Sequence, residues 1–388
     1  MKRRGLCFVL ALVIVLTLMV GCASKEKEEE TVKEEVEEIE EEKEESNDIP
    51  TLSIGYIFSN HQAPLIVAAA MNEEFKDEGV YLKEVVGGEE YVLMSGDDEI
   101  ANIDLVAVDD GEEIMAMMTQ GDLQMGLSSI DLPLTVIDDG HKIKILGPIN
   151  VDGIGLVMSE DSPINNADDF IEYVKIQDKP VIIGYPSPDN VSAILFETVM
   201  KEMNIMATED PDDINSDILL LDLKGTANLI PSLTNEQVDG WIGLSPFPEL
   251  AEVEKAGKVV LDMRDLPPSG KWHEFPCCVF SATDDAIEDY PEEMEQLFKL
   301  LVIASEYANE NKEDAGKLVA DWTGMSKDAA RSTTTIYTIE ASQKWFDNVD
   351  IILKHLQKSG KLEGELKGRA LKDIKNKIFY LDFAKNLQ

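Results

Sequence analysis

Hydrophobic positions between residues 51 and 282 fall in short runs that alternate with longer amphipathic stretches. The short runs are rich in β-branched residues and bounded by turn formers, which predicts strands. We expect strands at 52–58, 80–86, 123–129, 142–149, 153–159, 180–186, 217–223, 239–245, 258–263 and 277–282. Helical spacing predicts helices at 62–76, 111–119, 130–139, 166–175, 190–203, 226–235 and 247–256. This alternation predicts an α/β fold with parallel sheets and ligands at the carboxyl ends of strands.

Two regions depart from the alternation. Residues 87–110 predict an extra hairpin that turns near Gly96 and Asp97. From Asp284 onward the pattern becomes helical, and this part of the chain predicts a helical tail. Its helices are expected at 284–310, 312–323, 326–338, 340–358 and 365–386.

The first 22 residues predict export. Three basic residues after Met1 precede an apolar run over 5–21, the pattern of a signal peptide, which we assign to 1–21. Met19-Val20-Gly21-Cys22 resembles a lipobox, which implies that Cys22 is lipidated and becomes the new N-terminus. The alternative is an uncleaved membrane anchor, since the run only just reaches spanning length. Both readings place the body outside the cytoplasm and attached to a membrane.

Charge is the next constraint. Residues 22–50 hold fourteen acidic and four basic side chains with few apolar ones, which predicts a flexible acidic linker. The whole chain has a formal net charge of −43. So negative a chain repels nucleic acid, because neutralising phosphates requires clustered Lys and Arg. Nucleic acid is therefore excluded as a partner.

Cysteine use limits the chemistry further. Of four Cys residues, Cys7 leaves with the signal and Cys22 is the lipidation site, so only Cys277 and Cys278 remain in the body. The body is therefore no disulfide scaffold. We also expect no metal site and no cofactor. No pair of residues has the usual ligand spacing, and adjacent side chains on a strand point to opposite faces.

Four segments in order resemble the solute-binding proteins of ABC importers for nitrate, sulfonate, taurine and thiamine-pyrimidine precursors. Phe75, Gly79, Val80 and Leu82 supply the step from the first helix into the second strand. The other segments are TQGDLQMGLSS (119–129), NEQVDGWIGLSPFPELAE (235–252) and the late strand with the helix after it (277–311). Two positions depart from the family's motifs: Gln124 stands where Asp is commoner, and Glu236 stands where Gly is commoner. The likeness spans roughly 52–325.

The resemblance implies the type II periplasmic-binding-protein fold, in which two α/β lobes close on a ligand in the cleft between them. We place lobe one at 51–150 and 265–388, and lobe two at 151–264. The chain is expected to cross between the lobes near 149–153 and 264–276.

Loops after the strands are the expected ligand contacts. Ser, Asn and Asp there can cap the following helices and leave backbone N–H groups for a small polar or anionic ligand; ordinary capping is the alternative. The candidate ligand-binding residues are Asn60, His61, Gln62, Ser128, Ser129, Ser187, Asp189, Asn190, Ser245, Trp272 and His273. Because these loops hold no Arg or Lys, a ligand with at most one or two charges is expected. Two interpretations of His61 and His273 remain open: both contact the same ligand in the cleft, or they are polar loop residues that lie apart.

The functional hypothesis is a monomeric, lipid-anchored, non-enzymatic solute-binding protein that delivers a small organic solute to an ABC permease and its ATPase. One alternative is an enzyme, since iron-dependent thiamine-pyrimidine synthases resemble this family and carry a His after the first strand and a longer Cys cluster. Here only Cys277 and Cys278 stand at that cluster, so iron binding is in doubt. A surface sensor or interaction protein is the third possibility.

Overall fold

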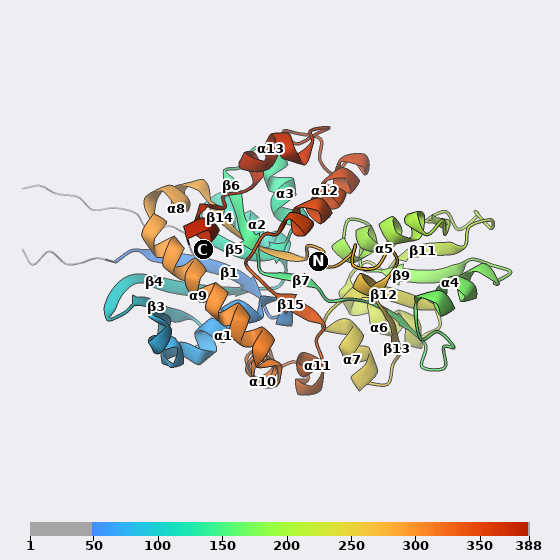
Figure 1. The fold of residues 1–388 in the computed structure, drawn as a ribbon, viewed down its shortest axis with the longest axis horizontal. Helices are drawn as coiled ribbons and strands as arrows, with labels where there is room; N and C mark the ends of the chain where they lie inside the picture. Colours follow the sequence, from blue (N-terminus) through green and yellow to red (C-terminus); the bar gives the residue numbers. More distant parts are fainter. Residues whose placement is uncertain (1–48, 387–388) are drawn as a thin grey trace, which may run out of the picture. The chain divides into compact units, whose positions relative to one another are not determined.

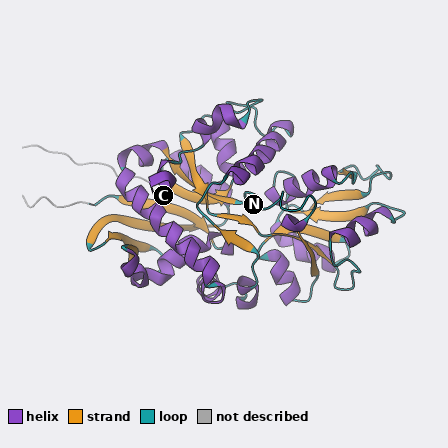
Figure 2. Ribbon diagram, in the orientation of Figure 1, coloured by secondary structure: helices purple, strands orange, loops and turns teal. Residues whose placement is uncertain are grey.

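The computed structural model describes residues 49–386, in which helices surround two mixed sheets (Figures 1 and 2). The predicted signal peptide, Cys22 and the linker up to residue 48 lie outside the described residues. Within the part that is described, no helix is long and apolar enough to cross a membrane.

The first sheet has seven strands in the order β2-β3-β4-β1-β5-β14-β6. They are β1 (Thr51–Ile57), β2 (Val80–Val86), β3 (Glu90–Ser95), β4 (Asp98–Val108), β5 (Met125–Ser129), β6 (Ile143–Pro148) and β14 (Cys278–Thr283). The helices that accompany it along the chain are α1 (Ala63–Met71), α2 (Gly111–Gln120), α3 (Asp131–Asp138), α8 (Asp284–Asp289), α9 (Pro291–Glu310) and α10 (Lys312–Thr323). Strands β3 and β4 are the predicted extra hairpin.

The second sheet has six strands in the order β10-β11-β9-β12-β8-β13. They are β8 (Ile154–Met158), β9 (Val181–Tyr185), β10 (Ala207–Thr208), β11 (Ile218–Asp222), β12 (Gly240–Leu244) and β13 (Lys258–Asp262). Its helices are α4 (Ala167–Lys175), α5 (Val191–Glu202), α6 (Leu229–Thr234) and α7 (Phe247–Val253).

The sheets are mixed rather than wholly parallel. β14 runs antiparallel to both β5 and β6, and β8 runs antiparallel to both β12 and β13. Each of these two strands directly follows a passage of the chain from one sheet to the other. The alternating pattern predicts the strands but does not encode this reversal.

A third, two-stranded sheet lies along the passages between the two larger sheets. β7 (Asn150–Asp152) follows β6 directly and pairs antiparallel with β15 (Thr335–Tyr337). Val151 also bridges Pro276, which lies on the return passage. The Asn309 side chain fixes β15 by donating to the Tyr337 carbonyl (2.7 Å) and accepting from its N–H (3.1 Å). Three distant segments therefore form the connection between the sheets.

The helical tail differs from its prediction in three places. The helix expected at 284–310 is divided at Tyr290 into α8 and α9. The helix expected at 326–338 stops early: α11 covers only Lys327–Arg331, and β15 follows it. The helix expected at 365–386 is divided into α13 (Leu371–Ile378) and α14 (Asp382–Asn386). α10 and α12 (Gln343–Lys358) match the two remaining expectations, 312–323 and 340–358, closely.

Asp138 attaches the tail to the first sheet's helices. This buried carboxylate at the end of α3 accepts from the N–H groups of Gly364 (2.7 Å) and Leu366 (2.6 Å). Hydrogen bonds to a charged acceptor are among the stronger ones in proteins. Asp138 therefore holds the segment before α13 in place.

We predict that Asp138→Ala destabilises the protein by about 2–3 kcal/mol, because the N–H groups of the buried Leu366 and of Gly364 both lose their acceptor. Urea unfolding of the variant and wild type measures the difference. Asp139→Ala is the matched control, since its side chain is exposed, and should change stability by less than about 0.5 kcal/mol. Equal losses in the two variants would show that the tail does not depend on Asp138.

Candidate functional site

A short 3-10 helix, η1 (Asn60–Gln62), follows β1 and is buried. Ser59 begins it, with its side chain accepting from the His61 N–H (3.2 Å). The Gln62 side chain accepts from the Ile57 N–H (3.1 Å) and donates to the Leu127 carbonyl (2.9 Å). Gln62, expected to bind ligand, therefore uses both ends of its amide to hold η1 against β1 and β5.

Asn150 joins η1 to the start of β14. Its fully buried side chain donates to the His61 carbonyl (2.6 Å) and accepts from the Cys278 N–H (3.1 Å). The Tyr337 hydroxyl adds a second support by donating to the Asn60 carbonyl (2.9 Å). Residues from β7 and β15 thus fix the backbone of η1, and Asn150 of β7 also holds the start of β14.

These contacts bring His61, Cys277 and Cys278 together. His61 Nδ1 lies 3.1 Å from Cys277 Sγ and 3.6 Å from Cys278 Sγ, and the two sulfurs are 3.8 Å apart. All three side chains are buried, and His61 Nε2 has no hydrogen-bond partner. The expectation that the two Cys side chains point to opposite faces is wrong, because Cys277 precedes β14 and is not held in its pleat.

The cluster favours one thiolate. The hydrogen bond from Cys277, together with His61, lowers the pKa of Cys278 to about 5 against the opposing effect of burial. Burial and the neighbouring Cys278 raise the pKa of Cys277 well above its usual range. One imidazole nitrogen and two sulfurs within 4.8 Å of one another also form a donor set that suits soft or borderline metal ions.

A polar network links η1 to the second sheet. Asn60 Nδ2 donates to Ser245 Oγ (2.9 Å), just after β12, and to Thr333 Oγ1 (3.1 Å), between α11 and β15. Ser245 Oγ donates to Glu249 Oε1 (2.9 Å) on α7, which also accepts from the Thr334 N–H (3.2 Å). Burial raises the pKa of Glu249. The network contains residues from both large sheets and from the tail.

The return passage is fixed by Asp152. This buried carboxylate accepts from the Phe275 N–H (3.1 Å), and burial raises its pKa to about 6. Arg264 lies 3.8 Å from Asp152 and 3.0 Å from Asp262, so the basic residue at the passage is already paired.

The remaining candidates lie elsewhere or serve the fold. Trp272 is fully buried and donates to the Pro267 carbonyl (3.0 Å), whereas His273 is exposed. The Ser129 hydroxyl donates a hydrogen bond to the Asp131 carboxylate, and Ser128 is buried. No side chain caps the start of α3, so neither serine has the expected capping role. In the loop between β9 and α5, Ser187 is exposed, and the Asn190 side chain caps the start of α5. Asp189 contacts Ser359 (3.3 Å) and Lys361 (3.6 Å) beyond α12.

The structure therefore brings together Asn60, His61, Gln62 and Ser245 among the expected residues. It adds Asn150, Glu249 and Thr333, which the sequence analysis missed. Glu249 follows Ser245 by four residues, one helical turn, and that spacing is a usable signal. Asn150 lies in a predicted passage, but nothing in the sequence around Thr333 indicates its role.

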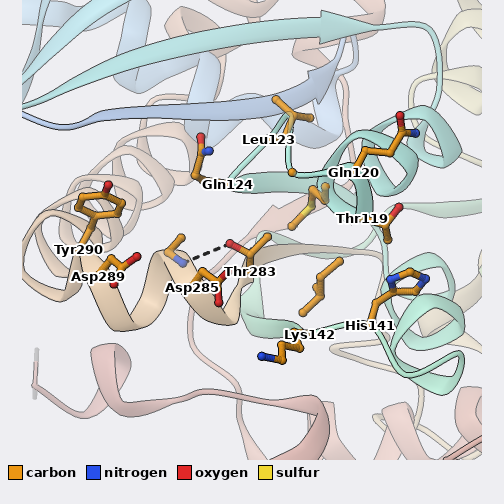
Figure 3. Close-up of a pocket in the computed structure, with 14 residues that line it drawn as sticks. Thr119, Gln120, Leu123, Gln124, His141, Lys142, Thr283, Asp285, Asp289 and Tyr290 are labelled. Carbon is orange, nitrogen blue, oxygen red and sulfur yellow. Dashed lines mark hydrogen bonds between the residues drawn. The ribbon is translucent and has the colours of Figure 1, made fainter.

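The polar network borders very little open space. Beside Asn60 and Thr333 the structure encloses only about 10 Å³, room for about one water. At the same end of the first sheet, about 790 Å³ is open beside Tyr56, Phe58 and Ala107, away from the network. A cavity of about 390 Å³ lies at the opposite end, where β5 begins and β14 ends (Figure 3). Gln124, His141, Thr283 and Tyr290 are among its lining residues. The polar network is therefore closed in this structure.

Comparison with solved structures identifies the fold. The ligand-binding component of an ABC-type import system from Staphylococcus aureus, solved with zinc, superposes with a TM-score of 0.63 at 13% identity, covering 87% of this chain and 99% of that one. The aliphatic sulphonate-binding protein SsuA of Escherichia coli gives 0.57 at 16%, covering 85% and 97%. The nitrate-binding protein NrtA of Synechocystis gives 0.57 at 16%, covering 87% and 88%. The molecule has the periplasmic-binding-protein fold with two α/β lobes.

The sequence profile of the NMT1-like family matches residues 45–324, and the chain belongs to this family. An uncharacterized protein of Methanocaldococcus jannaschii is 35% identical over 116 residues, which cover 29% of this chain and 80% of that protein. The suspected family and the fold class are thus confirmed.

We predict that the protein carries a Cys278 thiolate at pH 7 that is lost as the pH falls through about 5. Ultraviolet thiolate absorbance, taken as the difference between wild type and Cys278→Ser, measures it and removes the contribution of Cys7 and Cys22. Cys277→Ala should shift the titration upward, because the donor to the thiolate is lost. A difference signal that appears only above about pH 8 would contradict the assignment.

Proposed function

We propose that this protein is the solute-binding component of an ABC importer, which captures a small organic solute between its two lobes. The observation that carries the proposal is the hydrogen bond from Asn60, after β1, to Ser245, after β12. It joins the strand ends of the two sheets where the fold binds ligands. Membership of the NMT1-like family and the import-system neighbours support it.

The mechanism is capture, closure and recognition of the closed form by the permease. In the open form, Asn60 on lobe one and the Ser245 and Glu249 pair on lobe two separate, and the solute enters between them. Bound solute then takes over hydrogen bonds that the two lobes make to each other in its absence. A solute shifts the protein toward closure only as far as it binds the closed form better.

The finer features stay part of the proposal. They are the lobe boundaries (51–150 with 265–388, and 151–264), a monomeric state, partnership with a permease and an ATPase, and lipid attachment through Cys22 on the outer face of the cytoplasmic membrane. Sulfonate, nitrate, taurine-like and pyrimidine-like compounds are the solute classes that the family resemblance suggests. No catalysis is needed for this role.

We predict that a cognate solute raises the melting temperature of the full chain. At a solute concentration of one hundred times Kd, the free energy of unfolding should increase by about 2.7 kcal/mol. A thermal-shift screen of sulfonates, nitrate, pyrimidines, carboxylates and amines, with mass spectrometry of co-purified compounds, measures it. Asn60→Ala should weaken the response at least about tenfold, whereas Asn215→Ala, at an exposed position, should not. No stabilising or co-purified solute would contradict transport.

The His61, Cys277 and Cys278 cluster favours a second candidate, an iron-dependent enzyme that resembles the thiamine-pyrimidine synthases. The two sulfurs and one imidazole nitrogen could hold iron, which would supply redox chemistry when bound. The chain's own contribution would be to hold His61 next to the sulfurs through Asn150.

For this candidate we predict that ferrous iron in air causes oxidative loss of His61, detected by mass spectrometry. Asn150→Ala should reduce this loss, because His61 and Cys278 lose their common support. An intact His61 after iron treatment would eliminate the enzyme and leave the binding protein unaffected.

A further inference from the structure

Two buried oxygen atoms of the polar network have no hydrogen-bond partner: Asn60 Oδ1 and Glu249 Oε2. Asn60 is 1% exposed and Glu249 is 5% exposed. One atom belongs to the loop after β1 and the other to α7, so each large sheet contributes one (Figure 1). Leaving such acceptors unpaired is costly in a protein interior, which makes the pair informative about what binds there.

The direction of the hydrogen bonds fixes both atoms as acceptors. An ionised Glu249 can only accept, so the single hydroxyl proton of Ser245 points to Glu249 Oε1 (2.9 Å). Ser245 Oγ must then accept from Asn60 (2.9 Å), which requires the amide nitrogen of Asn60 on that side. The amide oxygen of Asn60 therefore remains unpaired, as does the second carboxylate oxygen of Glu249.

Positive charge is scarce around this pair. Among residues 49–386, no Lys or Arg side chain is buried. Arg264 is engaged by Asp262 (3.0 Å), and Lys361 by Asp189 (3.6 Å). Lys312 borders the small cavity near Asn60 but is exposed and forms no ion pair with Glu249 within the described structure. An anion at the junction would meet a carboxylate without a buried Lys or Arg to balance it, and the imidazole of the buried His61 lies against Cys277 and Cys278.

We propose that the solute of this site carries a nitrogen group with several N–H donors, an organic ammonium or amidinium, which bridges Asn60 Oδ1 and Glu249 Oε2. This inference rests on the proposed function and narrows its solute class away from nitrate and simple sulfonates. One –NH₃⁺ or =NH₂⁺ group donates to both lobes at once, so binding and closure become the same event. A charge-assisted hydrogen bond to Glu249 gives the selectivity.

Matched pairs of opposite charge test the proposal on the full chain at constant ionic strength. Guanidinium is compared with nitrate, which is also planar and trigonal, and ethylammonium with ethanesulfonate. Calorimetric titration should show binding of the cations and at least about tenfold weaker binding of the anions. Glu249→Gln should weaken cation binding by about 10- to 100-fold, the range expected for a hydrogen bond to a charged group.

Glu254→Gln is the matched control, because it removes the same charge from an exposed position next to α7 and should change affinity less than about twofold. If Glu249→Gln fails to fold by circular dichroism, the wild-type panel and Asn60→Leu decide instead. The inference is overturned if the anions bind and Glu249→Gln leaves their affinity unchanged. It is also overturned if the cations bind and Glu249→Gln leaves their affinity unchanged. Both outcomes would still agree with the proposed transport function. If no panel member binds and no small solute co-purifies, the proposed function fails, and the inference fails with it.

Discussion

The side-chain amide of Asn150 is the contact on which the rest of the site depends. A side-chain amide holds a donor and an acceptor in one rigid plane. Asn150 uses the donor for the His61 carbonyl in η1 and the acceptor for the Cys278 N–H at the start of β14. Because Asn150 itself begins β7, the first passage between the sheets holds the loop after β1 and the beginning of the return strand in one arrangement. The closeness of His61 to the two sulfurs, and the position of Asn60, follow from this contact.

Two different kinds of chemistry meet at η1. His61 faces the soft sulfur atoms of Cys277 and Cys278, while its neighbour Asn60 donates to the Ser245 hydroxyl of the other lobe and to the Thr333 hydroxyl of the tail. Successive residues of a tight turn can point in such different directions, whereas residues on one strand face would share an environment. A single turn after the first strand thus separates a buried sulfur cluster from the polar network that links the two lobes.

Local pattern was sufficient for most of the fold. Apart from the short strands β7 and β10, the strand and helix runs up to residue 282, the 87–110 hairpin and α12 follow from spacing and turn residues. The pattern failed where a long-range contact decided the outcome. Thr335–Tyr337 became a strand because β7 offered an unpaired edge, and the Cys pair converged because Pro276 and Asn150 set the backbone before β14. Asn60, His61 and Ser245 were found because they follow strands, but Thr333 lies in a segment that looks helical.

The position of β15 has a consequence for where this molecule can be divided. The family profile ends at residue 324, whereas Thr333 and Tyr337, which hold η1 and the lobe junction, lie beyond it. The portion that defines the family is therefore not a self-sufficient unit in this chain. The last tenth of the sequence packs against the edge strand β6 of the first sheet, whereas the stretch between α10 and α12 supplies one strand of the connection between the lobes. A shorter protein cut at the family boundary would keep both large sheets and lose the part that governs how they meet.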